Sequence, residues 1–407
     1  MTTQAATPAS RACIGMSCSI TLFMSVAAGA QVQLHELPIS LPSGCSNRGS
    51  LMSADGATVV GKLDTGAAGL WRLGTGAIEM GAFCPTGVNE FGSRACGIGS
   101  DGIAVVYDGE VRQVTSPSGQ EFAAYGIVGS VVVGSLGGRA AYSDAAGIQL
   151  VSGIPEDEHP SFVSSAATWK NWGAMAGTLQ GWSGKLGFVN LRGLFPTTTL
   201  ILRGPDGSQS WINDLDRYGI RAVGSVPFFA GPGPWVASIP NRACVWSFGP
   251  GWEFRPTLLR QLPATDRSDA RGASLYADVI VGTCTSSALG YRATAWAGGD
   301  RPIDLNRYLN CAGIDAPVLQ IAIGVSDDGT RILAHSGTRL YLITGFTPPP
   351  GPITDLNWDG NTDGVDLGLL LSAWGPCSSP CDSDLNRDGA VDGNDLAQLL
   401  AKWGSCP

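Results

Sequence analysis

The chain has 407 residues, enough for two or three domains, and 44 % of them are hydrophobic, which is sufficient for a sizeable core. Only 14 % are charged and 57 are glycine, a composition typical of turn-rich β proteins. The net charge of −9 and the lack of a Lys/Arg cluster argue against nucleic-acid binding, because phosphate contacts need clustered basic side chains.

Residues 1–30 are typical of a secretion signal. Arg11 supplies positive charge, an apolar stretch covers about 14–27, and Ala28-Gly29-Ala30 offers small residues where a signal peptidase reads. We therefore predict cleavage before Gln31 and a secreted, extracellular or cell-surface protein. A membrane anchor and a buried strand are the alternatives. The apolar stretch is short for a span of about 20 residues, and no second apolar run could cross a membrane.

The cysteines predict disulfides together with at least one thiol outside them. Eleven Cys are present, and Cys13 and Cys18 would leave with the signal. Nine would remain in an exported chain, where disulfides form and persist. Nine is odd, so at least one thiol is unpaired or bonds to another chain. The connectivity stays open.

Residues 31–346 show strand patterns and almost no helical periodicity. A weak repeat recurs in them. A turn such as Ser53-Ala54-Asp55-Gly56 leads into a valine-rich strand that ends in glycine, and a strand with an aromatic end, such as Ala68-Gly69-Leu70-Trp71, follows. Seven copies are centred near residues 60, 105, 132, 175, 223, 280 and 332.

These residues resemble the extracellular HAF repeat family over most of 45–345, which implies an all-β propeller of about seven blades. The spacing suits blades of four strands, except that the second and third copies lie only 27 residues apart, which points to a misassignment there. The physical reason for a propeller is that a small sheet cannot bury both faces alone, whereas stacking around an axis leaves only short edges. A β-sandwich with long loops is the alternative.

A proline-rich linker, residues 347–354, separates this region from an acidic tail, 355–407. Its prolines forbid helix and deny donors to a strand ladder, so we expect a stiff extended segment. From residue 353 to the end, nine Asp face only Arg387 and Lys402. Most of the excess negative charge therefore lies in the tail.

The tail contains two copies of a twelve-residue calcium loop, Asp355–Asp366 (loop 1) and Asp384–Asp395 (loop 2), 29 residues apart. Calcium takes six to eight oxygen ligands, and each loop offers them at positions 1, 3, 5, 7, 9 and 12. Position 6 is Gly360 or Gly389, as the sharp turn requires. The candidate ligands, with position 7 contributing its carbonyl, are Asp355, Asn357, Asp359, Asn361, Asp363 and Asp366 in loop 1, and Asp384, Asn386, Asp388, Ala390, Asp392 and Asp395 in loop 2.

A helix with one apolar face is predicted after each loop, carried by Leu367, Leu370, Leu371 and Trp374 and by Leu396, Leu399, Leu400 and Trp403. No helix pattern precedes either loop, which disfavours a calmodulin-like EF-hand. Paired loop-and-exit-helix units resemble a type I dockerin over the whole tail. The resemblance implies two bound Ca²⁺ ions, folding that depends on calcium, and a cohesin domain on a scaffold or cell-surface protein as partner.

Two features depart from that family. Loop positions 10 and 11, where the family often carries Ser/Thr recognition pairs, are Gly364-Val365 and Gly393-Asn394. The tail also holds three cysteines, and a disulfide that involves Cys406 would tie the C-terminus to the junction between the repeats. The first departure leaves the identity of the partner open.

No residue set in the chain predicts catalysis. His35, His159 and His335 stand in no known catalytic motif, and the dense polar segment Glu156–His159 is flanked by prolines as in a solvated loop. Trp169, Trp172 and Trp182 would serve either as a stacking platform for sugars or as blade core. We therefore predict a non-catalytic propeller displayed by a dockerin. The alternative, from resemblance alone, is a polysaccharide-degrading enzyme, a glycoside hydrolase or lyase, of a cellulosome-like assembly.

Overall fold

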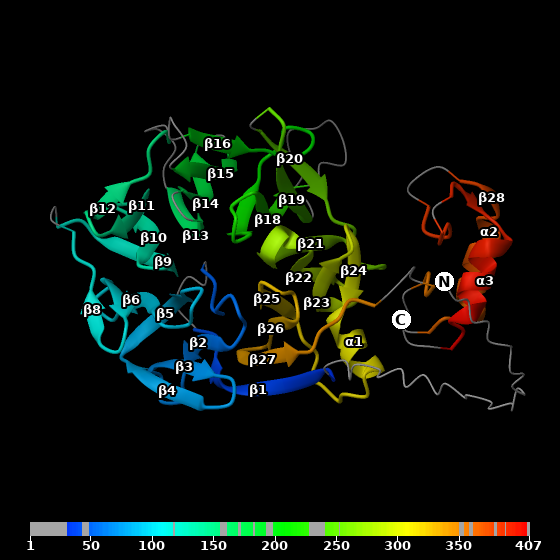
Figure 1. Cartoon of the computed structure of the whole chain (residues 1–407), viewed down its shortest axis with the longest axis horizontal. Coiled ribbons are helices and arrows are strands. Elements are labelled where there is room, and N and C mark those ends of the chain that lie inside the picture. Colours follow the sequence, from blue (N-terminus) through cyan, green and yellow to red (C-terminus); the bar gives the residue numbers. More distant parts are fainter. Residues whose placement is uncertain are drawn as a thin grey trace, which may run out of the picture. The chain divides into compact units, whose positions relative to one another are not determined.

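The structure is a computed structural model. It describes residues 31–42, 49–116, 119–154, 161–169, 172–181, 184–192, 198–227, 241–251, 253–349, 354–357, 361–377, 381–386 and 388–404. The predicted signal, residues 1–30, lies outside them. Val32–Pro407 forms one unit, in which strands β1 to β27 come before the C-terminal tail (Figure 1).

Five of the sheets in the described residues have four antiparallel strands each, paired in chain order. They are β5 (Phe83–Val88), β6 (Ala95–Gly99), β7 (Ala104–Tyr107) and β8 (Val111–Gln113); β9 (Phe122–Val128), β10 (Val131–Leu136), β11 (Arg139–Asp144) and β12 (Gly147–Leu150); β13 (Ser161–Trp169), β14 (Trp172–Gly181), β15 (Gly184–Arg192) and β16 (Thr198–Leu202); β17 (Trp211–Leu215), β18 (Arg221–Pro227), β19 (Asn241–Gly249) and β20 (Glu253–Leu258); and β21 (Arg267–Ala273), β22 (Val279–Ser286), β23 (Gly290–Ala297) and β24 (Arg301–Asp304).

A seven-stranded sheet supplies two further blades. Its order is β25 (Ile321–Val325), β26 (Arg331–Ser336), β27 (Arg339–Thr344), β1 (Gln33–Ser40), β2 (Thr58–Lys62), β3 (Ala68–Arg72) and β4 (Gly76–Gly81). Strands β1 and β2 pair only at Ser40 and Lys62, so the sheet divides there. A bridge between Met52 and Val59 adds an inner edge to β2.

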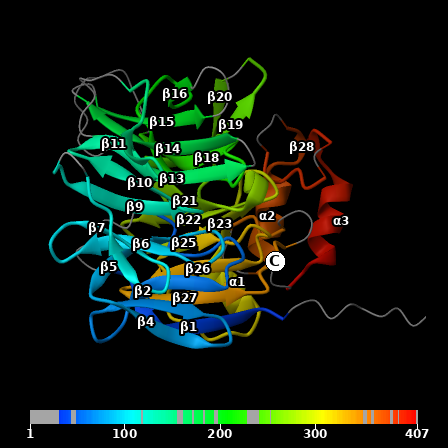
Figure 2. The ribbon, with the colours of Figure 1, turned by 60° about the vertical axis from the view of Figure 1, so that its left-hand side comes forward.

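The sheets follow one another around a ring, and each contacts the next (Figures 1 and 2). Because β1, from the start of the described chain, pairs with β27, from the end of the β region, the ring is closed by hydrogen bonds rather than by loops. The described strands thus form a propeller-like fold of seven blades, and the β-sandwich alternative is wrong. Its helices are the short turn η1 (Leu275–Ala277) and α1 (Leu305–Cys311).

Six of the seven predicted repeat copies fall on the second strand of a blade, and one does not. The copy near residue 105 is β7, the third strand of its blade, whereas the second strand is β6. Both strands are short, apolar and preceded by a glycine-containing turn, so the pattern alone does not separate them. Moving this copy to β6 removes the short step of 27 residues.

The glycine that ends each valine-rich run has a structural cause. A Cβ at Gly224 would lie 1.8 Å from the Trp211 carbonyl oxygen, and one at Gly282 would lie 2.0 Å from that of Asp269. Both glycines face a β-bulge in the inner strand of their blade. The bulge brings two backbones too close for any side chain, so the repeat carries glycine there.

The aromatic residue that ends the third strand packs in the core. Trp246 and Trp296 are fully buried, and their indole N–H groups donate to the carbonyls of Arg203 at 2.8 Å and Arg260 at 2.7 Å. A buried indole needs such an acceptor. Each tryptophan therefore joins two neighbouring segments through both its apolar surface and its single donor.

The cysteines divide into bonded and free, as the odd number predicts. Cys377 bonds to Cys381, and Cys84 and Cys311 are also disulfide-bonded. In the described residues Cys96, Cys244 and Cys284 are free, buried thiols. Cys406 lies outside the described residues, so the hypothesis that it ties the C-terminus to the repeat junction stays untested. Among the helices that the structure describes, none has the length and apolar character needed to cross a membrane.

Candidate metal centres in the tail and turn sites on the propeller

The tail is built from two equivalent loop-and-helix units. Loop 1 leads into α2 (Gly364–Ser372), and loop 2 leads into α3 (Gly393–Ala401). The short strands β28 (Gly375–Pro376) and β29 (Ala390–Val391) pair and link the units. Their shared core is small, with four buried residues: Leu370, Leu385, Val391 and Leu399. In the described residues neither loop follows a helix, as the sequence predicts.

Position 12 closes each loop through backbone hydrogen bonds. The fully buried carboxylate of Asp395 accepts N–H groups from Leu385 at 2.7 Å, Asn386 at 3.1 Å and Asp392 at 2.8 Å. Asp366 makes the same three contacts in loop 1, with the two residues that follow Asp355 and with Asp363. The chain therefore folds back on a buried carboxylate at both sites.

Position 9 caps the exit helix. Asp363 accepts the N–H of Val365 at 2.8 Å, and Asp392 accepts that of Asn394 at 2.7 Å. Together with position 12, each makes a reciprocal capping box. The short Asp at position 12, where many calcium loops carry Glu, is thus also the third helix residue, which completes the capping box.

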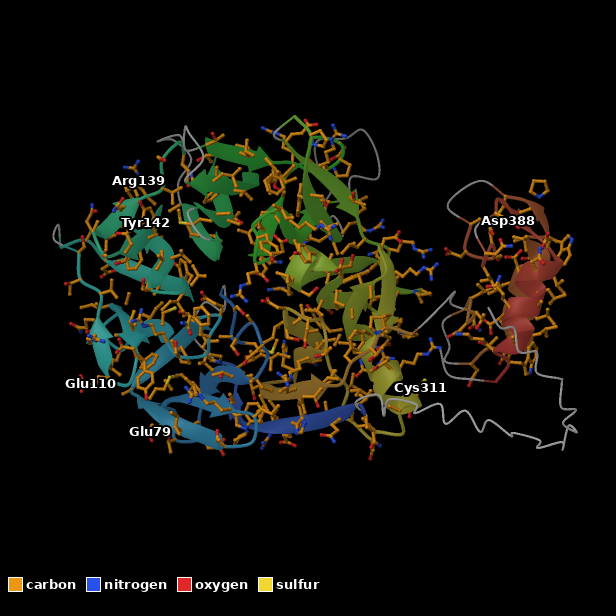
Figure 3. The ribbon with its side chains drawn as sticks, viewed as in Figure 1. Glu79, Glu110, Arg139, Tyr142, Cys311 and Asp388 are labelled. Atoms are coloured by element: carbon orange, nitrogen blue, oxygen red, sulfur yellow. A yellow bond between two sulfur atoms is a disulfide. The ribbon has the colours of Figure 1, made fainter. Side chains whose placement is uncertain are left out.

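Loop 2 wraps around the side chain at position 1. Asp384 accepts the N–H groups of Asp388 at 3.2 Å and Gly389 at 2.9 Å, and Asp388 accepts that of Ala390 at 3.1 Å. Figure 3 labels Asp388 in the tail. The side-chain carbonyl oxygen of Asn386 accepts the Asp388 N–H at 3.0 Å. Gly389 has φ +95°, so position 6 makes the sharp turn that the prediction assigned to it.

Position 1 of loop 1 is paired with a basic residue. Asp355 is fully buried, and its carboxylate pairs with the guanidinium of Arg307, from α1. Asn361 is exposed, whereas Asp359 and Gly360 lie outside the described residues. The two loops therefore share their closure by position 12, and in loop 1 a guanidinium from α1 also pairs with position 1.

The donor set suits a hard cation. All candidate side chains carry carboxylate or amide oxygens, the ligands that calcium takes. Among the residues that the structure describes, no three His, Cys, Asp or Glu side chains gather closely enough to hold a metal ion. In loop 2 the side chains at positions 3 and 5 already meet, because the Asn386 amide donates to the Asp388 carboxylate at 2.7 Å.

The predicted apolar face of each helix divides between core and surface. Leu370 and Leu399 are buried, and Leu367 and Leu396 pack against them. The other members are about half exposed: Leu371 49 %, Trp374 50 %, Leu400 50 % and Trp403 47 %. The predicted helices are present, but these four apolar residues lie at the surface. A core of four side chains is too small to cover them, and each helix is left with a Leu/Trp pair at its surface.

In the propeller, the structure describes two of the three histidines weighed for catalysis. His35 lies 3.3 Å from the Thr344 hydroxyl, and His335 lies 3.0 Å from the Gly337 carbonyl, with its pKa lowered by burial. Trp169 and Trp172 are paired backbone positions at the end of the β13–β14 hairpin. Glu156–His159 and Trp182 lie outside the described residues, so a stacking platform of the three tryptophans stays a prediction.

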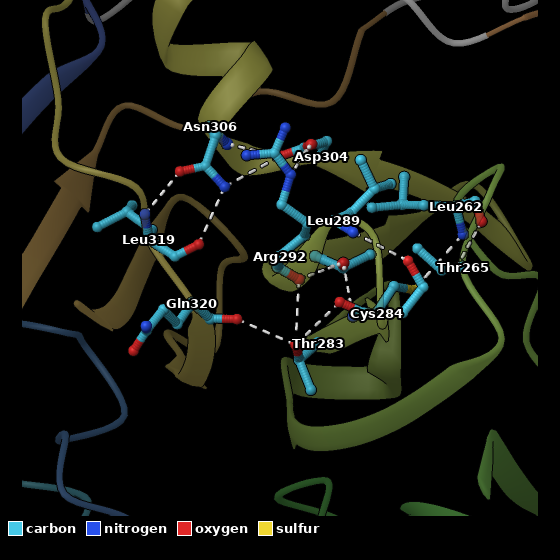
Figure 4. A network of polar contacts seen from close by, with 12 residues as sticks. Leu262, Thr265, Thr283, Cys284, Leu289, Arg292, Asp304, Asn306, Leu319 and Gln320 are labelled. Carbon is cyan, nitrogen blue, oxygen red and sulfur yellow. Dashed lines mark hydrogen bonds and ion pairs between the residues drawn. The ribbon is translucent and has the colours of Figure 1, made fainter. Parts of the chain in front are cut away.

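A polar network joins the blade of β21 to β24 with the segment before β25 (Figure 4). Thr283 donates to the Gln320 carbonyl at 3.0 Å, and Asn306 donates to and accepts from Leu319 at 2.9 and 2.6 Å. Arg292, whose Nε lies 3.3 Å from Asp304, and Asn306 line an adjacent cavity of about 540 Å³. Because these groups already bond across the blade boundary, the network holds two blades together.

A recurring turn, which the sequence only partly reveals, leads into the second strand of five blades. A fully buried polar residue accepts, through its side chain, the N–H of the residue five positions later, at 2.9 to 3.0 Å. The residue three positions later has positive φ. The five turns are 53–58, 89–94, 216–221, 274–279 and 326–331, and their polar residues are Ser53, Asn89, Asp216, Ser274 and Ser326.

Two of these turns are unusual. Asp216 carries a charge where the others have Ser or Asn, and burial raises its pKa to about 6. In the turn of Ser274, alanine replaces glycine at the position of positive φ: Tyr276 and Ala277 have φ +63° and +51°. A polar residue three positions before a glycine is the sequence signal that would have found four of the five turns.

Comparisons with known proteins give no family. No protein-family model and no curated protein matches the chain. Among solved structures it is similar to a GH74 xyloglucanase from Xanthomonas campestris, with 12 % identity over 78 % of this chain and 55 % of that one and a TM-score of 0.47. It is also similar to the tricorn protease, with 11 % identity over 76 % and 34 % and a TM-score of 0.46.

Kuenenia stuttgartiensis hydrazine synthase is likewise similar, with 11 % identity over 71 % of this chain and 93 % of that one and a TM-score of 0.44. At such identities and scores these likenesses carry no argument about activity. The chain is a propeller-like all-β protein with a small helical tail, on the strength of its own sheets.

Proposed function

We propose that this is a secreted protein whose dockerin-like tail binds two calcium ions and attaches it to a cohesin-bearing scaffold or cell surface, where the propeller presents a non-catalytic binding surface. The observation that carries the proposal is the duplication in the tail. Each unit combines an oxygen-rich loop, closed on a buried carboxylate, with a helix that exposes a Leu/Trp pair.

The loops support calcium binding through their charge. Each loop has four carboxylates within twelve residues, and like charges at such spacing repel. A bound Ca²⁺ would offset half of this charge and would add folding free energy to a tail whose described residues include a core of four buried side chains. In loop 1 the cation would have to displace Arg307 from Asp355.

Isothermal titration of the full chain with CaCl₂ tests this part. We expect two ions per chain for the native sequence and one for the double variant Asp384→Asn/Asp388→Asn. The matched control is Asp278→Asn, which changes an exposed carboxylate of the propeller. Absence of calcium binding at millimolar concentration, the weak end of the range for extracellular sites, would contradict the proposal.

The exposed Leu/Trp pairs support docking to a protein. Large aromatic residues dominate interface energetics, and a monomer gains nothing by exposing Leu371 with Trp374 and Leu400 with Trp403 in equivalent places. Capture of the full chain on a panel of immobilised cohesin domains tests this part. We expect calcium-dependent capture that weakens at least tenfold in Trp374→Ala/Trp403→Ala, and no change in Ile78→Ala, an exposed propeller position. Equal capture of the native chain and of Trp374→Ala/Trp403→Ala would show that the Leu/Trp pairs do not form the docking surface.

The non-catalytic assignment of the propeller has its own test. The full chain is incubated with neutral and acidic polysaccharides, and new reducing ends are measured beside retention of the protein. Retention without release is the expected result. Release of new reducing ends would contradict the non-catalytic assignment and would support the alternative, a glycoside hydrolase or lyase.

A further inference from the structure

We propose that the turns 216–221 and 274–279 form a saccharide subsite in which a neutral pyranose ring stacks on Tyr276, with Tyr218 behind it. The inference deepens the proposed function, because it names a ligand class for the propeller, and it stands without any property of the tail. Both tyrosines occupy the same place in the recurring turn, two residues after the buried polar residue. The blades that carry them are neighbours in the ring.

The two rings form a supported platform. Their centroids lie 4.9 Å apart with planes inclined by 32°. Tyr276 is 45 % exposed and Tyr218 is partly buried, so one ring backs the other and leaves a surface open. A tyrosine ring combines a large apolar face with a polar tip and few rotatable bonds. The C–H face of a pyranose is apolar and its edge carries hydroxyls, so the two shapes and polarities match.

The backbone at Tyr276 is in a strained conformation. Tyr276 and the following Ala277 both lie in the left-handed region, although neither is glycine, and the other four turns have glycine at the position of Ala277. Three contacts hold them there: Arg221 donates to the Tyr276 carbonyl, Leu275 N–H donates to the Asp327 carbonyl at 3.0 Å, and Ala277 N–H donates to that of Ser274 at 2.8 Å. Strain that is held in this way clusters at ligand sites.

The charges around the platform favour an uncharged ligand. Arg217 pairs with Asp327 at 2.6 Å, and Arg221 lies 3.9 Å from Asp278. Each guanidinium thus has a carboxylate beside it, and both pairs remain partly exposed. Asp216, the buried carboxylate of the turn 216–221, adds negative rather than positive charge. The surroundings therefore offer donors and acceptors to the hydroxyls of a neutral sugar, and they give an acidic polysaccharide no excess cation to bind.

Affinity electrophoresis of the full chain in native gels with hydroxyethylcellulose, glucomannan or polygalacturonate tests the proposal. We expect retardation by a neutral polymer, a loss of at least tenfold in affinity in Tyr276→Ala, and affinity within about threefold of the native value in Tyr276→Phe, which keeps the ring. Phe91→Ala is the matched control: Phe91 takes the same place in the turn 89–94 and is 68 % exposed. Its replacement should leave retardation unchanged.

Three outcomes would overturn the subsite: no retardation by either neutral polymer, retardation by polygalacturonate alone, or a Tyr276→Ala chain that is retarded like the native one. Thermal unfolding of each variant guards against a loss that reflects misfolding, and Tyr276→Phe keeps the test decisive if Tyr276→Ala unfolds. Calcium titration and cohesin capture of the same preparations keep the outcomes separate. A chain that binds calcium and cohesin but no neutral polymer would remove this inference and leave the docking function intact.

Discussion

Asp392 and Asp395 form a reciprocal capping box at the start of α3, in which Asp395 Oδ2 accepts the backbone N–H of Asp392 at 2.8 Å. The pair Asp363 and Asp366 does the same at the same distance in the first unit. Positions 9 and 12 of each loop therefore serve the fold of the tail directly, besides any role toward a cation.

We expect Asp395→Ala to destabilise the tail by about 3 kcal/mol or more, because three backbone donors lose a charged acceptor in a buried place. Hydrogen exchange of the full chain checks this, with faster exchange at the Leu385 and Asn386 amides and no change in the propeller strands. The control is Asn394→Ala, at an exposed position of the same helix, which should leave exchange at those two amides unaltered. Unchanged protection in Asp395→Ala would show that these hydrogen bonds are not needed.

Asp216 should make the propeller less stable as pH rises. Its folded pKa, raised to about 6 by burial, exceeds the unfolded value of ~3.9. Stability from this group is therefore complete below pH ~4 and is lost as pH rises through 6, a change of about 3 kcal/mol. Asp216→Asn keeps an oxygen for the N–H groups of Ile220 and Arg221. Denaturant unfolding should show it more stable than the native chain at pH 8 and equal at pH 4; equal stability at both would refute the buried charge.

Ala277→Gly should stabilise the fold by about 1 kcal/mol, since an L-residue in the left-handed region costs roughly 1–2 kcal/mol and glycine does not. The reciprocal change, Gly92→Ala, should destabilise it, because a Cβ there would lie 2.3 Å from the Thr58 hydroxyl oxygen. Melting temperatures of the two variants should therefore move in opposite directions. A lower melting temperature in Ala277→Gly would mean that the turn is not strained.

The thiols of Cys96, Cys244 and Cys284 should resist alkylation at pH 8 in the folded chain. All three are buried, and burial raises the pKa of Cys96 to about 12 and those of the other two above the ordinary value. A neutral, buried thiol is a poor nucleophile. Peptide mapping after iodoacetamide treatment should find them labelled only in denaturant; labelling under native conditions would indicate local opening of the blades.

The sequence by itself determined the repeating units. Val-Val-Gly runs mark second strands because a bulge opposite the glycine excludes a Cβ, as at Gly224 and Gly282. The acidic loops and their exit helices are equally local, since loop chemistry and capping depend on residues a few positions apart. Where two strands of one blade carry the same local pattern, as β6 and β7 do, the sequence alone did not distinguish them.

Only the tertiary structure decided which repeated positions differ in their surroundings. Two residues of one predicted apolar face have different surroundings: Leu370 lies in the core and Trp374 lies at the surface, because the tail has room to bury only a few side chains. The pairing of β1 with β27 closes the ring, and Tyr218 meets Tyr276 only when neighbouring blades stack. These contacts join residues far apart in the chain, and neither propensity nor spacing carries information about which distant segments will pack together.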